Sequence, residues 1–183
     1  MVAFIVILAV SVVFYRLYVG TPATSQLSDP ANDVTLSMGT QYPGMIDVVG
    51  GVLMVNGTTL TVTVNVRDPV SSLGDGEIAQ WNVTVILENE TDVLKTYEIS
   101  LEMNSSQLTG SIVDVETQSV RTCQVQYSGN SLTVFAVEDE LPKARTVEWN
   151  VLTLYEQYSG GELVTSASDL APDEGLQTTA LKP

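Results

Sequence analysis

The chain has 183 residues, and its 7 lysines and arginines stand against 22 aspartates and glutamates, which gives a net charge of −15. This charge argues against a nucleic-acid-binding protein, because phosphate contacts need a basic surface. There is no histidine and only one cysteine, Cys123. An intrachain disulfide, a zinc site of cysteines and histidines, and catalysis by a serine–histidine or cysteine–histidine pair are therefore excluded. We expect a protein that is not an enzyme.

Residues 1–19 form an apolar run, MVAFIVILAVSVVFYRLYV, whose first charged residue is Arg16. A helix of this length, at about 1.5 Å per residue, would measure about 28 Å, close to the roughly 30 Å of a bilayer's hydrocarbon layer. Its apolar side chains include Val2, Phe4, Ile5, Ile7, Leu8, Val12 and Phe14. We expect a membrane anchor. Two alternatives remain: a helix packed among its own copies in the core of a pilin-like filament, and a cleaved secretory signal.

Residues 20–28, GTPATSQLS, are small and polar and contain a proline, so we expect a linker there. A β-domain is expected over residues 29–167, followed by a C-terminal tail over 168–183 without usable periodicity. Residues 46–55 are an apolar run, and residues 59–67, TLTVTVNVR, alternate between apolar and polar side chains. That alternation is the period of a strand with one buried face. The Asn56-Gly57 pair between the two runs favours a hairpin with a type I′ turn.

Further strands are expected at residues 81–88, 94–101, 108–115, 122–127, 132–137, 145–155 and 162–166. Turn signals recur about every 8–12 residues, and no amphipathic helix pattern is present. The sequence therefore predicts an all-β fold, an antiparallel β-sandwich of the immunoglobulin-like or jelly-roll kind. Cys123 shares the alternation of Val125 and Tyr127, which indicates a core residue.

Four sequons for N-glycosylation occur, at Asn56, Asn82, Asn89 and Asn104. Three of them fall in predicted turns, and Asn82 falls on the outward face of its strand. Attached glycans would place the domain outside the cell. The alternative is that a threonine-rich β-protein contains such triplets by chance.

The stretches SDPANDV, starting at Ser28, IDVVGG, starting at Ile46, TLTVTVNV, starting at Thr59, and SDLAPDEG, starting at Ser168, resemble one group of β-sandwich domains. It is the group around DOMON domains and family-nine carbohydrate-binding modules. Its members begin with an Asp-Pro-x-Gly-Asp turn, continue into an Ile-Asp strand and close with an Asp-x-Ala-Pro stretch. Asn32 stands where the group more often has glycine.

This resemblance implies a secreted sandwich that binds sugar or haem. Haem binding in the DOMON branch uses a methionine and a histidine, which a chain without histidine does not supply. Sugar binding in the other branch uses exposed tryptophans, so Trp81 and Trp149 are the ligand-binding candidates. Their alternation with neighbouring valines favours the core instead.

If the opening and closing segments lie side by side, as the resemblance implies, Asp29, Asp33, Asp47 and Asp169 converge. Clustered carboxylates suit Ca²⁺, a hard cation that prefers oxygen ligands, and calcium is the candidate cofactor. The alternative is that these aspartates cap turns.

The sequence thus predicts a non-enzymatic extracellular protein of the cell surface, tethered through residues 1–19, with a structural or ligand-binding role. A subunit of a surface filament and a carbohydrate-binding module are the alternatives. The expected partners are a membrane or copies of the chain itself, and glycans.

Overall fold

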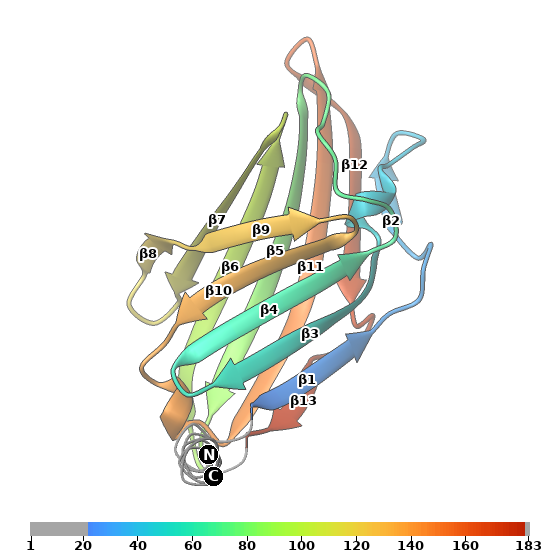
Figure 1. Cartoon of the computed structure of the whole chain (residues 1–183). Coiled ribbons are helices and arrows are strands. Elements are labelled where there is room, and N and C mark those ends of the chain that lie inside the picture. The colour runs from blue at the N-terminus through green and yellow to red at the C-terminus, as the bar shows by residue number, and fades with distance from the viewer. Residues whose placement is uncertain (1–21, 182–183) are drawn as a thin grey trace, which may run out of the picture.

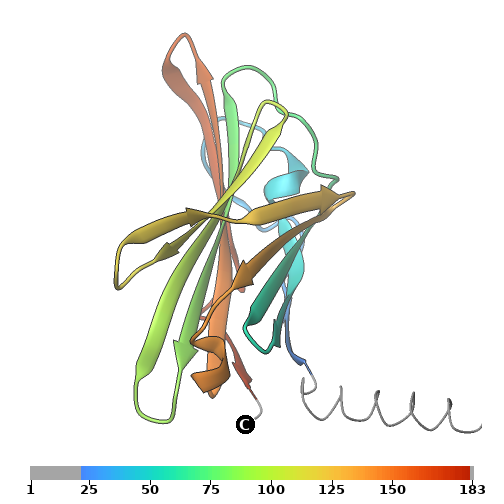
Figure 2. The same cartoon turned by 60° about the vertical axis from the view of Figure 1, so that its left-hand side comes forward.

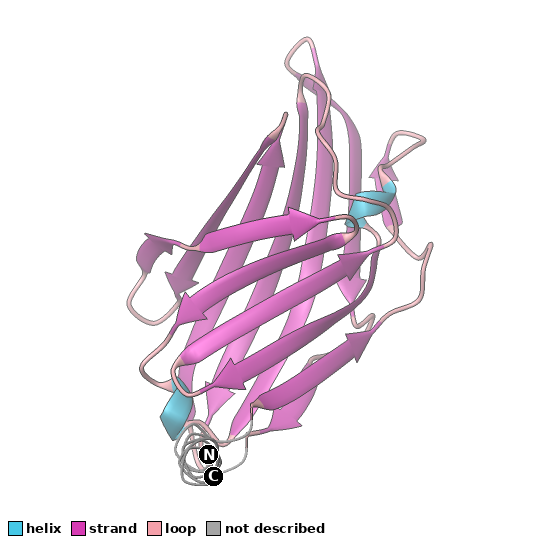
Figure 3. Ribbon diagram, in the orientation of Figure 1, coloured by secondary structure: helices cyan, strands magenta, loops and turns pink. Residues whose placement is uncertain are grey.

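The structure is a computed structural model that describes residues 22–181, so the expected anchor or filament helix at residues 1–19 lies outside the described residues. Within 22–181 the regular secondary structure consists almost entirely of antiparallel strands, which form two sheets (Figure 3). The helical segments of this range are two three-residue 3-10 turns, η1 (Gly44–Ile46) and η2 (Leu141–Lys143). No helix in the described range has the length and apolar character to cross a membrane. The prediction of an antiparallel β-sandwich is confirmed.

The smaller sheet has five strands in the order β1-β3-β4-β10-β9. Their bounds are β1 (Ala23–Ser28), β3 (Val48–Asn56), β4 (Thr59–Val66), β10 (Ser131–Val137) and β9 (Gln124–Ser128). In Figure 1 this sheet lies in front of the larger one and crosses it obliquely, and Figure 2 shows the two layers from the side.

The larger sheet follows the order β2-β12-β11-β5-β6-β7-β8. Its strands are β2 (Thr35–Met38), β12 (Glu162–Ala171), β11 (Thr146–Ser159), β5 (Glu77–Glu88), β6 (Val93–Asn104), β7 (Gln107–Asp114) and β8 (Ser119–Thr122). An eighth strand, β13 (Gln177–Ala180), pairs with residues 146–149 of β11, whereas β12 pairs with residues 151–159 of the same strand. β12 and β13 therefore pair one after the other with the same strand, β11, and residues 172–176 form the break between them.

Two boundaries expected from the sequence are wrong. Residues 23–28 of the expected linker form β1, which pairs with β3 from Ala23↔Val55 to Ser28↔Gly50. The expected tail from residue 168 onward contains the end of β12 and the whole of β13. β1 and β13 are short and have few buried residues, so their strand structure depends on pairing rather than on a hydrophobic pattern.

The alternating pattern of β4 works as predicted, because its four apolar residues at even positions are all buried between the sheets. The hairpin between β3 and β4 is also present, with Asn56 paired to Thr59. Its two central residues are Gly57 and Thr58, and of these only Gly57 has a positive φ, of 60°. This is the pattern of a type II′ turn, so the predicted type I′ turn is wrong.

The strand expected over residues 122–127 is in fact two strands in different sheets. β8 ends at Thr122 in the larger sheet, and β9 begins at Gln124 in the smaller one. Cys123 carries the chain from one sheet to the other and is half-buried against the core beside Gly110.

Trp81 and Trp149 are the two largest core residues, and both are 0 % exposed. The Trp81 indole N–H donates to the carbonyl of Met45 at 3.0 Å, and that of Trp149 donates to Ser25 Oγ at 2.9 Å. A Cβ added to Gly51 would lie 2.9 Å from the Trp149 ring. The ring of Trp149 therefore fits against β3 only because residue 51 has no side chain.

Candidate metal centre

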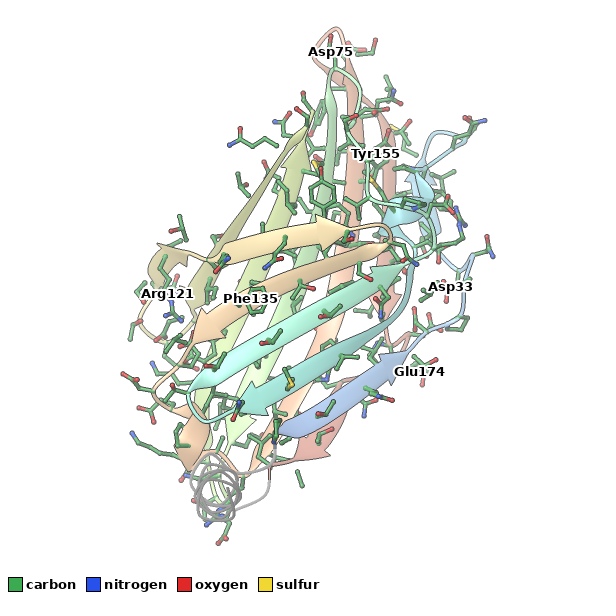
Figure 4. All side chains as sticks on the ribbon, viewed as in Figure 1. Asp33, Asp75, Arg121, Phe135, Tyr155 and Glu174 are labelled. Atoms are coloured by element: carbon green, nitrogen blue, oxygen red, sulfur yellow. The ribbon has the colours of Figure 1, made fainter. Side chains whose placement is uncertain are left out.

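Five aspartates meet where the segment after β1 approaches the end of β12. Asp29 and Asp33 lie between β1 and β2, Asp47 lies between η1 and β3, Asp169 is in β12, and Asp173 is in the interruption between β12 and β13. Carboxylate oxygens of Asp29, Asp33 and Asp173 lie within 4.8 Å of one another, as do those of Asp33, Asp47 and Asp169. We call these five residues the acidic cluster. Figure 4 labels Asp33 and Glu174, the neighbour of Asp173, on the same side of the molecule.

The four aspartates that the sequence singled out are thus brought together. Asp173 is a fifth member that sequence reasoning missed. It lies in the SDLAPDEG stretch, four residues after Asp169. Since Asp169 is in a strand and Asp173 is in the following loop, no simple periodicity relates the two.

The inner members of the acidic cluster are held by hydrogen bonds from the protein itself. The oxygens of Asp47, which is fully buried, accept the Asn32 amide at 2.9 and 3.2 Å, and Oδ2 also accepts Arg67 Nη1 at 2.7 Å. Asp169 Oδ2 accepts the backbone amide of Val48 at 2.7 Å. These bonds fix two carboxylates in place and fasten β12 to the start of β3.

Asn32 sets the course of the chain through the acidic cluster. It has a φ of 70°, in the left-handed region that asparagine tolerates better than most residues with a side chain. Its side-chain oxygen accepts a hydrogen bond from Arg67 Nη1 at 2.6 Å. This turn, which favours glycine or asparagine, thus lies between Asp29 and Asp33 and brings Asp33 close to Asp47.

The outer members of the acidic cluster lack such partners. Asp29 is only 8 % exposed, and neither of its carboxylate oxygens accepts a hydrogen bond from the described residues. The two buried oxygens of Asp33 also lack a donor there. Each buried polar group without a hydrogen-bond partner destabilises a folded protein by roughly 1–3 kcal/mol, and a charged group costs more. Asp29 therefore calls for a positively charged partner.

The electrostatics of the acidic cluster lead to the same conclusion. Burial raises the pKa of Asp29 to about 7, and the charges of Asp169, Asp33 and Asp173 add to the effect. The backbone amide of Asp173 lowers this pKa and offsets only part of the rise. Burial likewise raises the pKa of Asp169 to about 6, and the pKa of Asp33 is raised for the same reason.

The charges of the acidic cluster are not balanced within the described part of the chain. The ion pairs of residues 22–181 supply one cation to it, Arg67, which is paired with Asp47. With all five carboxylates ionised, the acidic cluster and Arg67 carry −5 + 1 = −4. A divalent cation would halve this charge.

The spacing of the oxygens suits a metal ion. Ca²⁺ binds oxygens at about 2.3–2.6 Å, so two ligands on opposite sides of one ion are about 4.8 Å apart. The oxygens of Asp29, Asp33 and Asp173 fall within that limit. This donor set consists of carboxylate oxygens from two loops, the one between β1 and β2 and the one between β12 and β13. It contains no nitrogen or sulfur ligand, which zinc prefers.

The tryptophans that the sequence offered as sugar-binding platforms do not fit that role. Trp81 and Trp149 are fully shielded inside the sandwich, so neither ring can stack on a ligand. A polar pocket of about 400 Å³ does lie beside Tyr155, lined by residues 40–43, Glu77, Gln157 and Thr165. Its carboxylate, Glu77, already accepts hydrogen bonds from the Gly74 amide, the Tyr155 hydroxyl and the Gln157 amide. The polar groups of this pocket are thus largely satisfied by one another, unlike Asp29.

The four sequons lie at accessible positions. Asn56 and Asn104 are exposed at the ends of hairpin strands, and Asn82 is half-exposed on the outward face of β5. Asn89 is half-exposed in the turn after β5, where its side-chain oxygen accepts the amides of Thr91 and Asp92, both at 2.8 Å.

Comparison with known proteins adds no relative from which a role could be transferred. No protein-family model matches the chain, and no curated protein has a significantly similar sequence. The resemblance to the DOMON group therefore stays a prediction, and the acidic cluster is the feature from which a function is inferred.

Proposed function

We propose that this chain is a non-enzymatic β-sandwich domain of the cell surface whose acidic cluster binds Ca²⁺. The observation that carries the proposal is Asp29, which is 92 % buried and whose carboxylate accepts no hydrogen bond from the described residues. One of its oxygens lies within 4.8 Å of carboxylate oxygens of Asp33 and Asp173. The bound ion would replace the missing donors of Asp29 and Asp33. Its role is structural, because it would join loops from both sheets.

Calcium fits this site better than magnesium does. Ca²⁺ accepts 6–8 oxygens in adaptable geometry, whereas Mg²⁺ demands a near-ideal octahedron at about 2.0–2.1 Å and keeps several waters. The carboxylates come from several separate segments of the chain, and Asp173 is exposed, so water can complete an irregular coordination shell. Extracellular calcium modules bind with dissociation constants of roughly 10⁻⁴–10⁻³ M, and a site of this kind would be filled outside a cell.

Isothermal titration calorimetry, in which calcium is added to the full chain at pH 8, tests the proposal. We expect a dissociation constant in the range of roughly 10⁻⁴–10⁻³ M, weakened at least tenfold by Asp29→Asn. Asp75→Asn is the matched control, because Asp75 is exposed in the loop before β5 and lies far from the acidic cluster (Figure 4). Unchanged affinity in Asp29→Asn, or no calcium binding at all, would falsify the proposal.

The cell-surface location is tested by the sequons. In protein purified from the cells that naturally make it, we expect glycan masses on peptides that contain Asn56, Asn82, Asn89 or Asn104, because the structure leaves each side chain accessible. Mass spectrometry of proteolytic peptides measures this directly. Unmodified asparagine at all four positions would remove this support for an extracellular domain.

A further inference from the structure

Strand β1 is the edge of the smaller sheet that lies next to the acidic cluster. It is an edge strand with β3 as its one neighbour in that sheet, and it is six residues long. Only Ser25 and Leu27 of its six residues are buried. The chain enters the described domain through this strand. A force applied to the chain before β1 would therefore act on the sandwich through β1.

β13 closes the same edge from the other sheet. It is four residues long and packs beside β1 (Figure 1). The link between the two strands is polar: Ser25 Oγ lies 2.7 Å from Thr179 Oγ1 and accepts the Trp149 indole N–H at 2.9 Å. One hydroxyl thus joins β1, β11 and β13.

Both short strands are adjacent to loops of the acidic cluster. Asp29 immediately follows β1, and its amide makes only a long hydrogen bond of 3.5 Å to the carbonyl of Val49. Asp173 lies four residues before β13. At pH 8, above the raised pKa of Asp29, the carboxylates of Asp29 and Asp173 repel each other in the absence of a cation, whereas an ion bound between them would hold the two loops together.

We infer that calcium in the acidic cluster acts as a latch, which holds β1 and β13 closed on the sandwich and opens this edge when the ion leaves. The inference rests on the proposed function, because it assigns a regulatory consequence to the same calcium site. The calcium concentration thus sets how strongly β1, through which the chain enters the domain, is held on the rest of the sandwich. When the latch is open, Leu27 becomes exposed to solvent and the indole N–H of Trp149 loses its hydrogen bond to Ser25.

Hydrogen exchange measured by mass spectrometry tests the latch on the full chain, kept in a non-ionic detergent. We expect amides of residues 23–28 and 177–181 to exchange more slowly in calcium than in chelator. If opening requires loss of the ion, the slowing approaches the factor 1 + [Ca²⁺]/Kd, about 100-fold at 100 times Kd. β10 is the internal reference, because it lies between β4 and β9 and away from the acidic cluster.

Asp29→Asn and Asp75→Asn serve as the matched variants here too. Selective slowing at β1 and β13 in the wild type and in Asp75→Asn, but not in Asp29→Asn, supports the latch. Calcium binding by calorimetry with no greater slowing at β1 and β13 than at β10 overturns the latch and leaves the proposed calcium function standing. Absence of calcium binding in calorimetry overturns both.

Discussion

Calcium should raise the thermal unfolding midpoint of the metal-free protein by roughly 5–11 °C at a free concentration of 100 times Kd. A ligand that binds only the folded state adds about 2.7 kcal/mol at this concentration, and 1 kcal/mol shifts the midpoint of a domain of this size by about 2–4 °C. Circular dichroism at pH 8, in calcium and in chelator, measures the shift. Magnesium at equal concentration should have the smaller effect, because it dehydrates reluctantly.

The variant Asp29→Asn should change stability with opposite sign in the two conditions. In chelator it removes a buried carboxylate that accepts no hydrogen bond from residues 22–181, so we expect its unfolding midpoint to lie above that of the wild type, by about 2–4 °C for each kcal/mol gained. In calcium it lacks a ligand, so the order of the two proteins reverses. A calcium-induced rise of equal size in the variant and the wild type would contradict the assignment of Asp29 as a ligand.

Replacement of Arg67 by methionine should destabilise the metal-free protein by about 2–3 kcal/mol, because it leaves a buried charge without its partner. Asp47 is fully buried and accepts Arg67 Nη1 at 2.7 Å. Arg67 itself keeps some contact with water, with 28 % of its side chain exposed, so the loss should fall below that of a fully buried pair. Urea unfolding at pH 8 in chelator measures it.

Calcium should restore part of this loss and should bind Arg67→Met more tightly than the wild type. Without Arg67 the acidic cluster has a charge of −5 instead of −4, which increases its attraction for a cation. Arg145→Met is the control, because Arg145 is exposed and forms no ion pair in the described range. The same small loss of stability in both variants, with no recovery in calcium, would argue against an electrostatic role for Arg67.

Strands with a full apolar face could be predicted from the sequence, whereas the short strands β1, β2 and β13 could not. β4 has four buried residues at alternating positions, and this local signal is sufficient to identify it. β1, β2 and β13 are short and largely polar, and β2 has no buried residue. Their conformation is imposed by the neighbouring strands β3, β12 and β11, which lie far away in sequence.

The acidic cluster shows a similar division. Asp29, Asp33, Asp47 and Asp169 could be grouped from the resemblance of their flanking motifs, and the structure places them together. What the sequence could not supply is which carboxylates are already satisfied. That depends on donors such as the Val48 amide, which lies 121 positions from Asp169 along the chain. Only the folded structure separates Asp47 and Asp169, which accept hydrogen bonds, from Asp29, which accepts none from the part of the chain that the structure describes.

The contact between Gly51 and Trp149 restricts how this sandwich can vary in evolution. Any side chain at position 51 would enter the space of the indole ring, 2.9 Å from its nearest carbon, and would also lie 3.0 Å from the Thr63 carbonyl. A substitution at position 51 is therefore compatible with the fold only when position 149 becomes smaller at the same time. We therefore expect positions 51 and 149, which are 98 residues apart, to covary in related sequences: glycine and tryptophan are kept together or replaced together.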